Sequence, residues 1–207
     1  MPHQRRLLSK WNRVDSGELH LAPRRWQRWL SDTGSLTQKI EEHIAQKLEV
    51  RVLRDSRQTL NSDESRYFHF QPQRCRVREV LLCKGNTPLV IARSVIPASS
   101  ILGGNQGLLR LGNKPLGAVL FAKKPNSSKR KVLREICYLS KRDPFWQHFQ
   151  KLYPSLPSKL WARRTLYQLK GKPILVCEVF LPALLATKAF NPSQASLNQS
   201  LIAWLRN

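Results

Sequence analysis

The sequence predicts a single α+β domain built on an antiparallel β-sheet of about six strands. Two observations carry this prediction. Runs rich in β-branched residues are joined by short glycine turns, as in antiparallel hairpins, and segments with a helical pattern stand apart from those runs. The regular alternation of strand and helix that is typical of a parallel sheet does not occur. The length of 207 residues suits one domain.

The N-terminal part is predicted to begin with a loose basic arm over residues 1–22. Pro23 is well placed at the start of a short helix, because the fixed φ of proline suits the first helical turn. Trp26, Trp29 and Leu30 then share one face, as expected for a helix that packs on a core.

A second helix is predicted to follow Ser35. The segment Ser35-Leu36-Thr37-Gln38 has the spacing of a capping box, in which the serine hydroxyl accepts a hydrogen bond from the backbone three residues along. We expect this helix to end near Ala45. Residues 47–54 (KLEVRVLR) alternate between polar and apolar side chains, which predicts a strand.

Two hairpins are expected to form the centre of the sheet. Gly85 lies in the turn of the first hairpin and Gly171 in the turn of the second, where a left-handed backbone is commonly required. The strands are predicted over Arg74–Cys83, Pro88–Pro97, Leu160–Leu169 and Pro173–Leu181.

The remaining segments are assigned from their turn residues and charge. We expect a glycine-rich connector over 103–112, a short helix over 115–121, an exposed basic loop over 123–131 and a helix over 143–153. The domain is predicted to span residues 1–186. Residues 187–207 are expected to form a C-terminal tail that is helical from Ser196 to Leu205.

The net charge of +23 is the most unusual feature of the composition. Such a charge favours anionic small substrates, polyanions or a transient contact with an anionic membrane surface. No nucleic-acid-binding motif accompanies it, so no specific nucleic acid is predicted as a partner, and a basic surface without a specific partner is the alternative. The sequence contains neither the apolar segment of a signal peptide nor a stretch long enough to span a bilayer, which predicts a cytoplasmic protein.

Glu178 is the first candidate for chemistry. It is the only charged residue between Ile174 and Leu181, and strand alternation gives it the same face as Ile174, Val176 and Phe180. Because the other members of that face are apolar, we expect the face to be buried. A desolvated carboxylate suits proton transfer. The alternative is a side chain that points to solvent from a half-buried strand.

Arg78 poses the same question on the first hairpin. It shares a face with Val80 and Leu82 but also with two further arginines, so alternation leaves burial and exposure equally open. A buried guanidinium needs an anion, which would be either Glu178 or a ligand carboxylate. Arg93 is a weaker candidate of the same kind.

Other chemical signatures do not occur in the sequence. The histidines lack the spacing of metal ligands, and there is no Cys-x-x-Cys, P-loop, Gly-x-Ser-x-Gly or dinucleotide-binding motif. The cysteines are expected to be reduced and mostly buried. Cys75 and Cys83 on one predicted strand would lie roughly 26 Å apart, too far for a disulfide.

A series of short blocks carries a family resemblance. In chain order they are Ser35-Leu36-Thr37, REVLLC from Arg78 with GNTP, ARSVIP from Ala92, LGNKPLGAVLF from Leu111, LWARR from Leu160 and GKPILVCEVFLP from Gly171. Together they resemble the chorismate lyase, or chorismate pyruvate-lyase, family over roughly residues 24–182. Residues from about 141 to 158, the C-terminal tail and the high charge are not expected from that resemblance.

The resemblance implies a ligand enclosed beneath helical flaps and the cleavage of chorismate to 4-hydroxybenzoate and pyruvate, the first step of ubiquinone synthesis. It also implies a monomer without metal or organic cofactor. Arg78 would hold the ring carboxylate, Glu178 would lie beside the ring hydroxyl and ether, and both would be catalytic. Leu36, where the family often has methionine, and Leu116 would complete the substrate-binding site.

Two other functions are left open by the sequence. Some effector domains of transcription regulators resemble chorismate lyase in fold and sense small ligands. Those domains normally follow a winged-helix domain, for which the residues before the matching region are too few. A nucleic-acid-binding protein, suggested by charge alone, would use the basic segment Lys123–Arg134.

Overall fold

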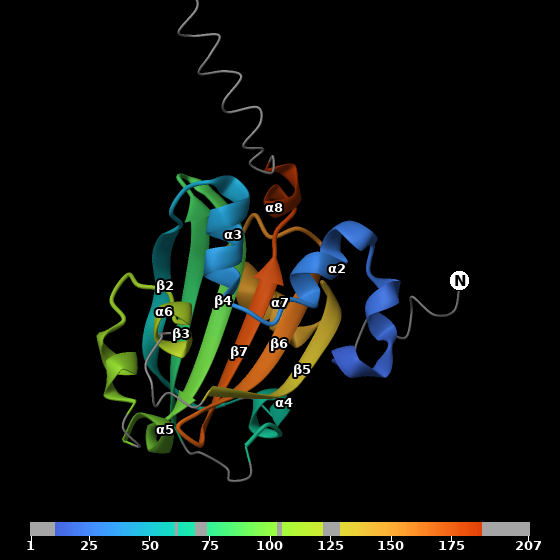
Figure 1. Ribbon diagram of the computed structural model, residues 1–207. Helices are drawn as coiled ribbons and strands as arrows, with labels where there is room; N and C mark the ends of the chain where they lie inside the picture. The colour runs from blue at the N-terminus through green and yellow to red at the C-terminus, as the bar shows by residue number, and fades with distance from the viewer. Residues whose placement is uncertain (1–10, 61, 69–73, 103–104, 122–128, 188–207) are drawn as a thin grey trace, which may run out of the picture.

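The computed structural model describes residues 11–60, 62–68, 74–102, 105–121 and 129–187. They form one seven-stranded sheet in the order β1-β5-β6-β7-β4-β3-β2, and all of its strand pairs are antiparallel (Figure 1). This confirms the predicted α+β fold with an antiparallel sheet.

The helices are short, and every strand except β1 is 9 to 12 residues long. The strands are β1 (Asn12–Arg13), β2 (Glu49–Gln58), β3 (Cys75–Lys84), β4 (Thr87–Pro97), β5 (Lys129–Ser140), β6 (Lys159–Leu169) and β7 (Lys172–Phe180). The α-helices are α2 (Arg24–Leu30), α3 (Leu36–Ile44), α4 (Ser62–Ser65), α5 (Ala98–Leu102), α6 (Gly117–Leu120), α7 (Pro144–Leu152) and α8 (Ala183–Ala186), and the 3₁₀ helices are η1 (Val14–Ser16), η2 (Glu18–Leu21) and η3 (Gln106–Arg110).

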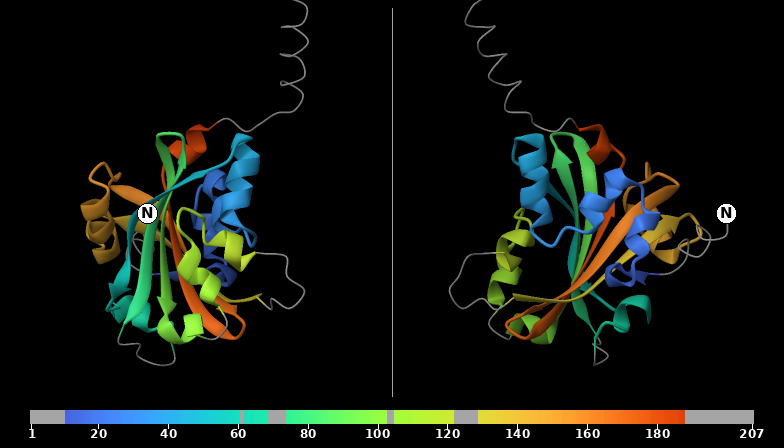
Figure 2. Two further views of the ribbon diagram at one scale, coloured as in Figure 1. Left: turned by 90° about the vertical axis from the view of Figure 1, so that its left-hand side faces the viewer. Right: turned by 45° about the vertical axis from the view of Figure 1, so that its right-hand side comes forward.

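Helices cover both faces of the sheet. The edge-on view in Figure 2 shows α2, α3 and α6 on one face and α7 on the other. Trp29 and Leu30 of α2 and Ile40 of α3 are buried on the first face, and Phe149 of α7 is buried on the second. Burial of such large apolar side chains is the main source of stability for a layered fold.

The predicted helices after Pro23 and Ser35 are confirmed. Pro23 is the residue before α2, and the Ser35 hydroxyl accepts a hydrogen bond from the backbone of Gln38 at 3.3 Å. This is the first half of the predicted capping box. The helix ends because Ala45 adopts a left-handed conformation with φ 53°.

Both predicted hairpins are confirmed as β3–β4 and β6–β7. The second turn consists of Lys170 and Gly171, which have φ values of 51° and 71°. Two consecutive residues with positive φ match the right-handed twist of the flanking strands, and this fixes the register of the hairpin.

Strand β5 was not predicted, and it corrects one expectation. The basic loop expected over 123–131 ends by residue 128, because Lys129, Arg130 and Lys131 pair with Leu169, Gln168 and Tyr167 of β6. Backbone pairing with a long neighbouring strand decides their conformation here, not side-chain polarity. Residues 122–128 of that loop lie outside the described residues.

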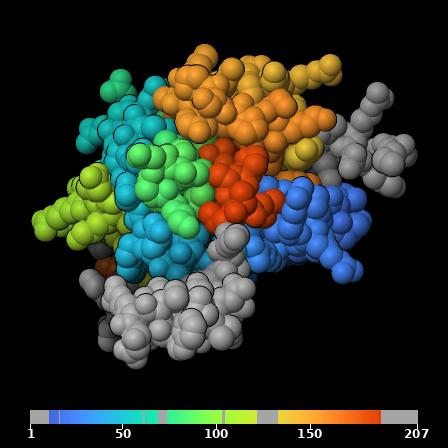
Figure 3. All heavy atoms as spheres, turned by 90° about the horizontal axis from the view of Figure 1, so that it is seen from above, coloured from blue at the N-terminus to red at the C-terminus, as the bar shows by residue number. Residues whose placement is uncertain are grey.

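The ends of the chain also differ from the expected picture. Residues 1–10 of the predicted basic arm lie outside the described residues, but β1 pairs with β5 and is followed by η1 and η2. At the other end, α8 packs against β4 between the β3–β4 hairpin tip and α2 (Figure 3). The helix predicted over 196–205 lies outside the described residues. No helix in the described ranges has the length and hydrophobicity needed to cross a bilayer.

Candidate active site

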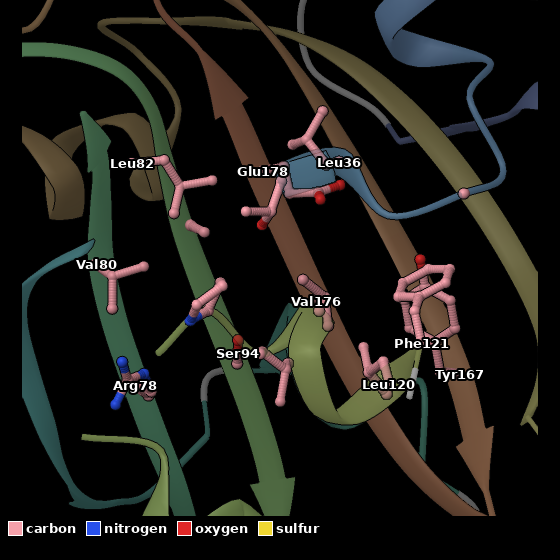
Figure 4. A pocket seen from close by; sticks show the side chains of 16 residues that line it. Leu36, Arg78, Val80, Leu82, Ser94, Leu120, Phe121, Tyr167, Val176 and Glu178 are labelled. Carbon is pink, nitrogen blue, oxygen red and sulfur yellow. The ribbon is translucent and has the colours of Figure 1, made fainter. Parts of the chain in front are cut away.

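A cavity lies between the sheet and the helices α3 and α6. It encloses about 540 Å³, part of it open to solvent. Figure 4 shows side chains from β3, β4, β6 and β7 forming its floor, with Leu36 above them. Its lining consists of Gly34, Leu36, Thr37, Arg78, Val80, Leu82, Ala92, Ser94, Pro115, Leu116, Gly117, Leu120, Phe121, Tyr167, Val176 and Glu178. The largely apolar wall with a few polar side chains suits a small organic molecule.

The cavity brings together every residue that was predicted to form the site. Arg78 lies on β3 and Glu178 on β7, while Leu36 opens α3 and Leu116 immediately precedes α6. Arg78 is 3% exposed and Glu178 is 8% exposed. The prediction that both charged side chains are buried and face one cavity is therefore confirmed.

The sheet register sets the spacing of the two charges. Arg78 is opposite Ser94 of β4, and Glu178 is opposite Ala92 of the same strand. The two residues are thus two strands apart and offset by two positions, which places their Cα atoms roughly 12 Å apart. Their side chains extend from the same face, so a small ring with a polar group at each end fits between them.

Arg78 is held by partners from neighbouring segments. Its Nη1 lies 3.2 Å from Oδ2 of Asp55 on β2, and its Nη2 donates to the carbonyl oxygen of Lys114 at 3.2 Å. Burial lowers the pKa of Arg78, and the Asp55 charge opposes that shift. Glu178, which the sequence left open as the counterion of Arg78, is instead paired with another arginine.

Asp55 is shared between two arginines. Arg76 donates to it through Nε at 2.6 Å and Nη2 at 2.7 Å, in addition to the contact from Arg78. Burial alone would raise the pKa of Asp55, but hydrogen bonds and positive charge from both arginines hold that pKa below its usual value. Asp55 therefore remains a carboxylate and partly neutralises the Arg78 end of the cavity.

Glu178 is paired with Arg163 of β6. Arg163 Nε donates to Glu178 Oε2 at 2.6 Å, and the Arg163 side chain is completely buried. Burial lowers the pKa of Arg163, but the Glu178 charge outweighs it and the net shift is upward. Glu178 also lines the cavity, so its carboxyl group can accept a hydrogen bond from a ligand.

Tyr167 of β6 supplies a further polar group to the cavity wall. Burial, followed by the nearby Glu178 charge, raises the pKa of Tyr167. The phenol therefore stays protonated at neutral pH and can act as a hydrogen-bond donor. Phe121 packs edge-on against its ring, with centroids 6.2 Å apart.

The roof of the cavity consists of two helix N-termini that approach each other closely. A Cβ atom added at Gly117 would lie 3.0 Å from Ser35 Oγ and 3.7 Å from Thr37 Oγ1. Only the absence of a side chain at Gly117 lets α3 and α6 meet at this distance. The two helices correspond in position to the helical flaps that the sequence resemblance implies.

Arg93 does not belong to this site. Its guanidinium binds Glu64 and Glu79, each at 2.6 Å, and it approaches His148 of α7. Strand alternation gives Arg93 the opposite face from its neighbours Ala92 and Ser94, so it lies beneath α7. The interpretation of Arg93 as a candidate residue of this site is therefore wrong.

Sequence reasoning missed Asp55 and Arg163. Arg163 could have been found, because counting back from the two-residue turn at Lys170-Gly171 places it directly opposite Glu178. Asp55 could not, because β2 and β3 are joined by a long connection and their pairing shifts register between Val52 and Arg54.

Comparison with known proteins bears on this geometry. The family profile described as chorismate lyase matches residues 7–190. The chain belongs to the chorismate lyase family. A relative from Nitrosospira multiformis, named a probable chorismate pyruvate-lyase, is 37% identical over 86% of this chain and 96% of its own length. A chorismate pyruvate-lyase from Yersinia enterocolitica is 34% identical over 75% of this chain and 80% of its own length.

Solved structures resemble this chorismate lyase family member more distantly. The ligand-binding domain of a GntR-family transcriptional regulator from Bordetella bronchiseptica matches with a TM-score of 0.47 and 18% identity, over 66% of this chain and 85% of that domain. The C-terminal domain of the histidine utilization repressor from Pseudomonas syringae matches with a TM-score of 0.49 and 8% identity, over 70% of this chain and 96% of that domain.

Among the described residues, no group of three or more His, Cys, Asp or Glu side chains could hold a metal ion. All four cysteines are buried and free, as expected from the sequence. That this family member works without a metal or organic cofactor stays a prediction.

Proposed function

We propose that this protein cleaves chorismate to 4-hydroxybenzoate and pyruvate, with Arg78 and Glu178 holding the substrate from its two ends. The observation that carries the proposal is the placement of both buried charges on the wall of one largely apolar cavity. Membership of the chorismate lyase family supports the same reaction.

The charges of the cavity match the polar groups of the substrate. The guanidinium of Arg78 suits the ring carboxylate, because arginine binds carboxylates with two parallel hydrogen bonds. The Glu178 carboxylate suits the ring hydroxyl as a hydrogen-bond acceptor. Val80 and Val176 on the floor and Leu36 and Leu116 above supply apolar contacts for the ring.

The reaction needs no external reagent. The C–H bond breaks at the ring carbon that carries the hydroxyl, and the C–O bond breaks at the neighbouring carbon that carries the enolpyruvyl ether. A new ring double bond forms and makes the ring aromatic, while one proton ends on the methylene carbon of the released enolpyruvate and gives pyruvate. Because aromatisation supplies the driving force, the protein contributes mainly by orientation.

Glu178 is assigned to orient the ring hydroxyl, and through it the C–H bond that breaks. Tyr167, a protonated phenol on the cavity wall, is available to donate a hydrogen bond to the ether oxygen or to the second carboxylate. Arg78 fixes the far end of the ring, so that both breaking bonds lie near these groups.

The test is the formation of 4-hydroxybenzoate from chorismate by the purified protein, followed by its ultraviolet absorbance, beside pyruvate measured with lactate dehydrogenase. We expect equal amounts of the two products. Arg78→Ala should lower kcat/KM by a factor of about 100 or more, because it removes a charged anchor. Absence of turnover by the wild-type protein would overturn the proposal.

A further inference from the structure

We propose that Arg163 is a positioning residue of this site, which joins the Glu178 carboxylate to the turn that carries the α3 roof. The inference rests on the proposed lyase function and deepens it. Arg163 does not line the cavity itself. It acts through two neighbours that do, Glu178 and the segment leading to Leu36.

The guanidinium of Arg163 uses separate nitrogens for the two tasks. Its Nε donates to Glu178 Oε2 at 2.6 Å. Its Nη1 donates to the carbonyl oxygens of Trp29, at 2.7 Å, and of Asp32, at 2.9 Å. One rigid planar group therefore fixes the distance between the carboxylate and the α2–α3 turn.

The turn that Arg163 holds is the C-terminal end of α2, which ends at Leu30. Carbonyl oxygens there have no partner within the helix, so a buried cation is a favourable ligand for them. Four residues after Asp32, Leu36 opens α3 and lines the cavity. A change at Arg163 is therefore transmitted to the roof as well as to Glu178.

Arg134 of β5 holds the same turn but not the carboxylate. Its Nη1 donates to the carbonyl oxygens of Ser31, at 3.0 Å, and of Asp32, and its Nε to Thr165 at 3.3 Å. Among the described residues, Arg163 alone bonds both Glu178 and the α2–α3 turn. Hydrogen bonds from these two arginines of the sheet hold the turn against it, and Glu178 is the neighbouring anion.

Arg164 provides a matched control. It is adjacent on β6 and 1% exposed, compared with 0% for Arg163, but strand alternation directs it to the opposite face. There it binds Asp63 at 2.8 Å and Tyr67 at 3.2 Å, and stacks on Trp11. Loss of either arginine removes a buried charge from the same strand, but of the two only Arg163 contacts a residue that lines the cavity.

The experiment compares Arg163→Lys and Arg163→Gln with Arg164→Lys and Arg164→Gln, all as full chains. Three quantities are measured: kcat for chorismate, KM for chorismate, and the affinity for 4-hydroxybenzoate by isothermal titration calorimetry. Lysine keeps the charge beside Glu178 but cannot reach Glu178, Trp29 and Asp32 together, since it is a single point donor.

Arg163→Lys should weaken 4-hydroxybenzoate binding about tenfold, because hydrogen bonds to the turn are lost. Arg163→Gln, which also removes the cation beside Glu178, should weaken binding at least as much and lower kcat as well, because the carboxylate is then held neither by charge nor by the planar guanidinium.

The Arg164 variants should lose stability without changing the kcat, the KM or the 4-hydroxybenzoate affinity of the folded fraction. If both pairs of variants alter these quantities alike, or if Arg163→Lys binds 4-hydroxybenzoate like the wild type, the proposal is wrong. Should Arg163→Gln fail to fold, the lysine variant decides alone. Failure of the wild-type protein to release 4-hydroxybenzoate would instead contradict the proposed function, so the two failures are distinguishable.

Discussion

The Asp55 carboxylate lies 3.2 Å from the Arg78 guanidinium, so the group assigned to the substrate carboxylate already has an anion beside it. Asp55 is on the edge strand β2 and also binds Arg76. The positive charge at this end of the cavity is thus partly neutralised, and an incoming carboxylate approaches the like charge of Asp55. Such an arrangement limits how tightly the aromatic product is held.

We therefore expect Asp55→Asn to tighten 4-hydroxybenzoate binding about fivefold, because removal of a nearby like charge is worth about 1 kcal/mol in a partly solvated site. Asparagine still accepts a hydrogen bond and keeps Arg78 oriented. Titration calorimetry measures the change. Glu49→Gln, an exposed change on the same strand, is the control and should have no effect. Weaker binding by Asp55→Asn would show that Asp55 chiefly orients Arg78.

A second prediction concerns the contact between α3 and α6. Gly117→Ala places a Cβ atom 3.0 Å from Ser35 Oγ, so that the Ser35 side chain, which caps α3, must shift by a few tenths of an ångström. Overpacking of this kind costs about 1–3 kcal/mol, so we expect roughly tenfold weaker binding of 4-hydroxybenzoate and faster product release. Stopped-flow measurement of product dissociation checks this.

Gly107→Ala is the matched control for Gly117→Ala, because a Cβ atom at Gly107 would meet nothing within 4 Å and its φ is not positive. It should leave both dissociation and affinity unchanged. Equal effects of the two substitutions, or tighter binding by Gly117→Ala, would contradict a role for the close approach of the roof helices.

The third prediction concerns stability beneath α7. Glu79 is completely buried and binds both Arg93, at 2.6 Å, and His148. Burial raises the pKa of Glu79, but hydrogen bonds and positive charge from His148 and Arg93 outweigh it, so the pKa is lowered overall. Because the folded protein binds this proton less tightly than the unfolded chain, the stabilisation is present at neutral pH and is lost as pH falls through the acid range.

Glu79→Gln should therefore reduce the free energy of unfolding by about 3–5 kcal/mol at pH 7 and should flatten its decline below pH 5. Urea unfolding at a series of pH values measures both effects. Glu49→Gln again serves as the control. A decline in acid as steep as that of the wild type would show that other carboxyl groups, such as Asp55, dominate acid unfolding.

The sequence predicted the elements whose structure is set by local contacts. The two hairpins, the Pro23 and Ser35 helix starts and the buried face of Glu178 all follow from turn residues and strand alternation. The resemblance of the sequence blocks to one family then selected Arg78 over its exposed alternative, which alternation alone could not do.

What could not be predicted depends on contacts between distant segments. Lys129–Lys131 extend β5 because β6 is long enough to pair with them, and nothing local favours a strand there. The partner of Arg78 is Asp55 because an irregular β2–β3 register brings them opposite each other. Both features depend on tertiary pairing, which residue type does not encode.

The final prediction addresses the net charge of +23. Chorismate is a dianion, and a strongly basic protein attracts it over distances of about 8–10 Å at ordinary ionic strength. If this attraction speeds capture, kcat/KM should fall about tenfold between low and high salt while kcat changes little.

Two lysine variants locate the effect. Lys114 is exposed, and its carbonyl oxygen accepts a hydrogen bond from Arg78 beside the cavity. Lys114→Gln should therefore reduce the salt dependence of kcat/KM. Lys151→Gln on α7, on the other face of the sheet, should not. A kcat/KM that does not respond to salt would contradict a role of the net charge in substrate capture. Contact with an anionic membrane surface stays a prediction, and binding to anionic vesicles would then test it.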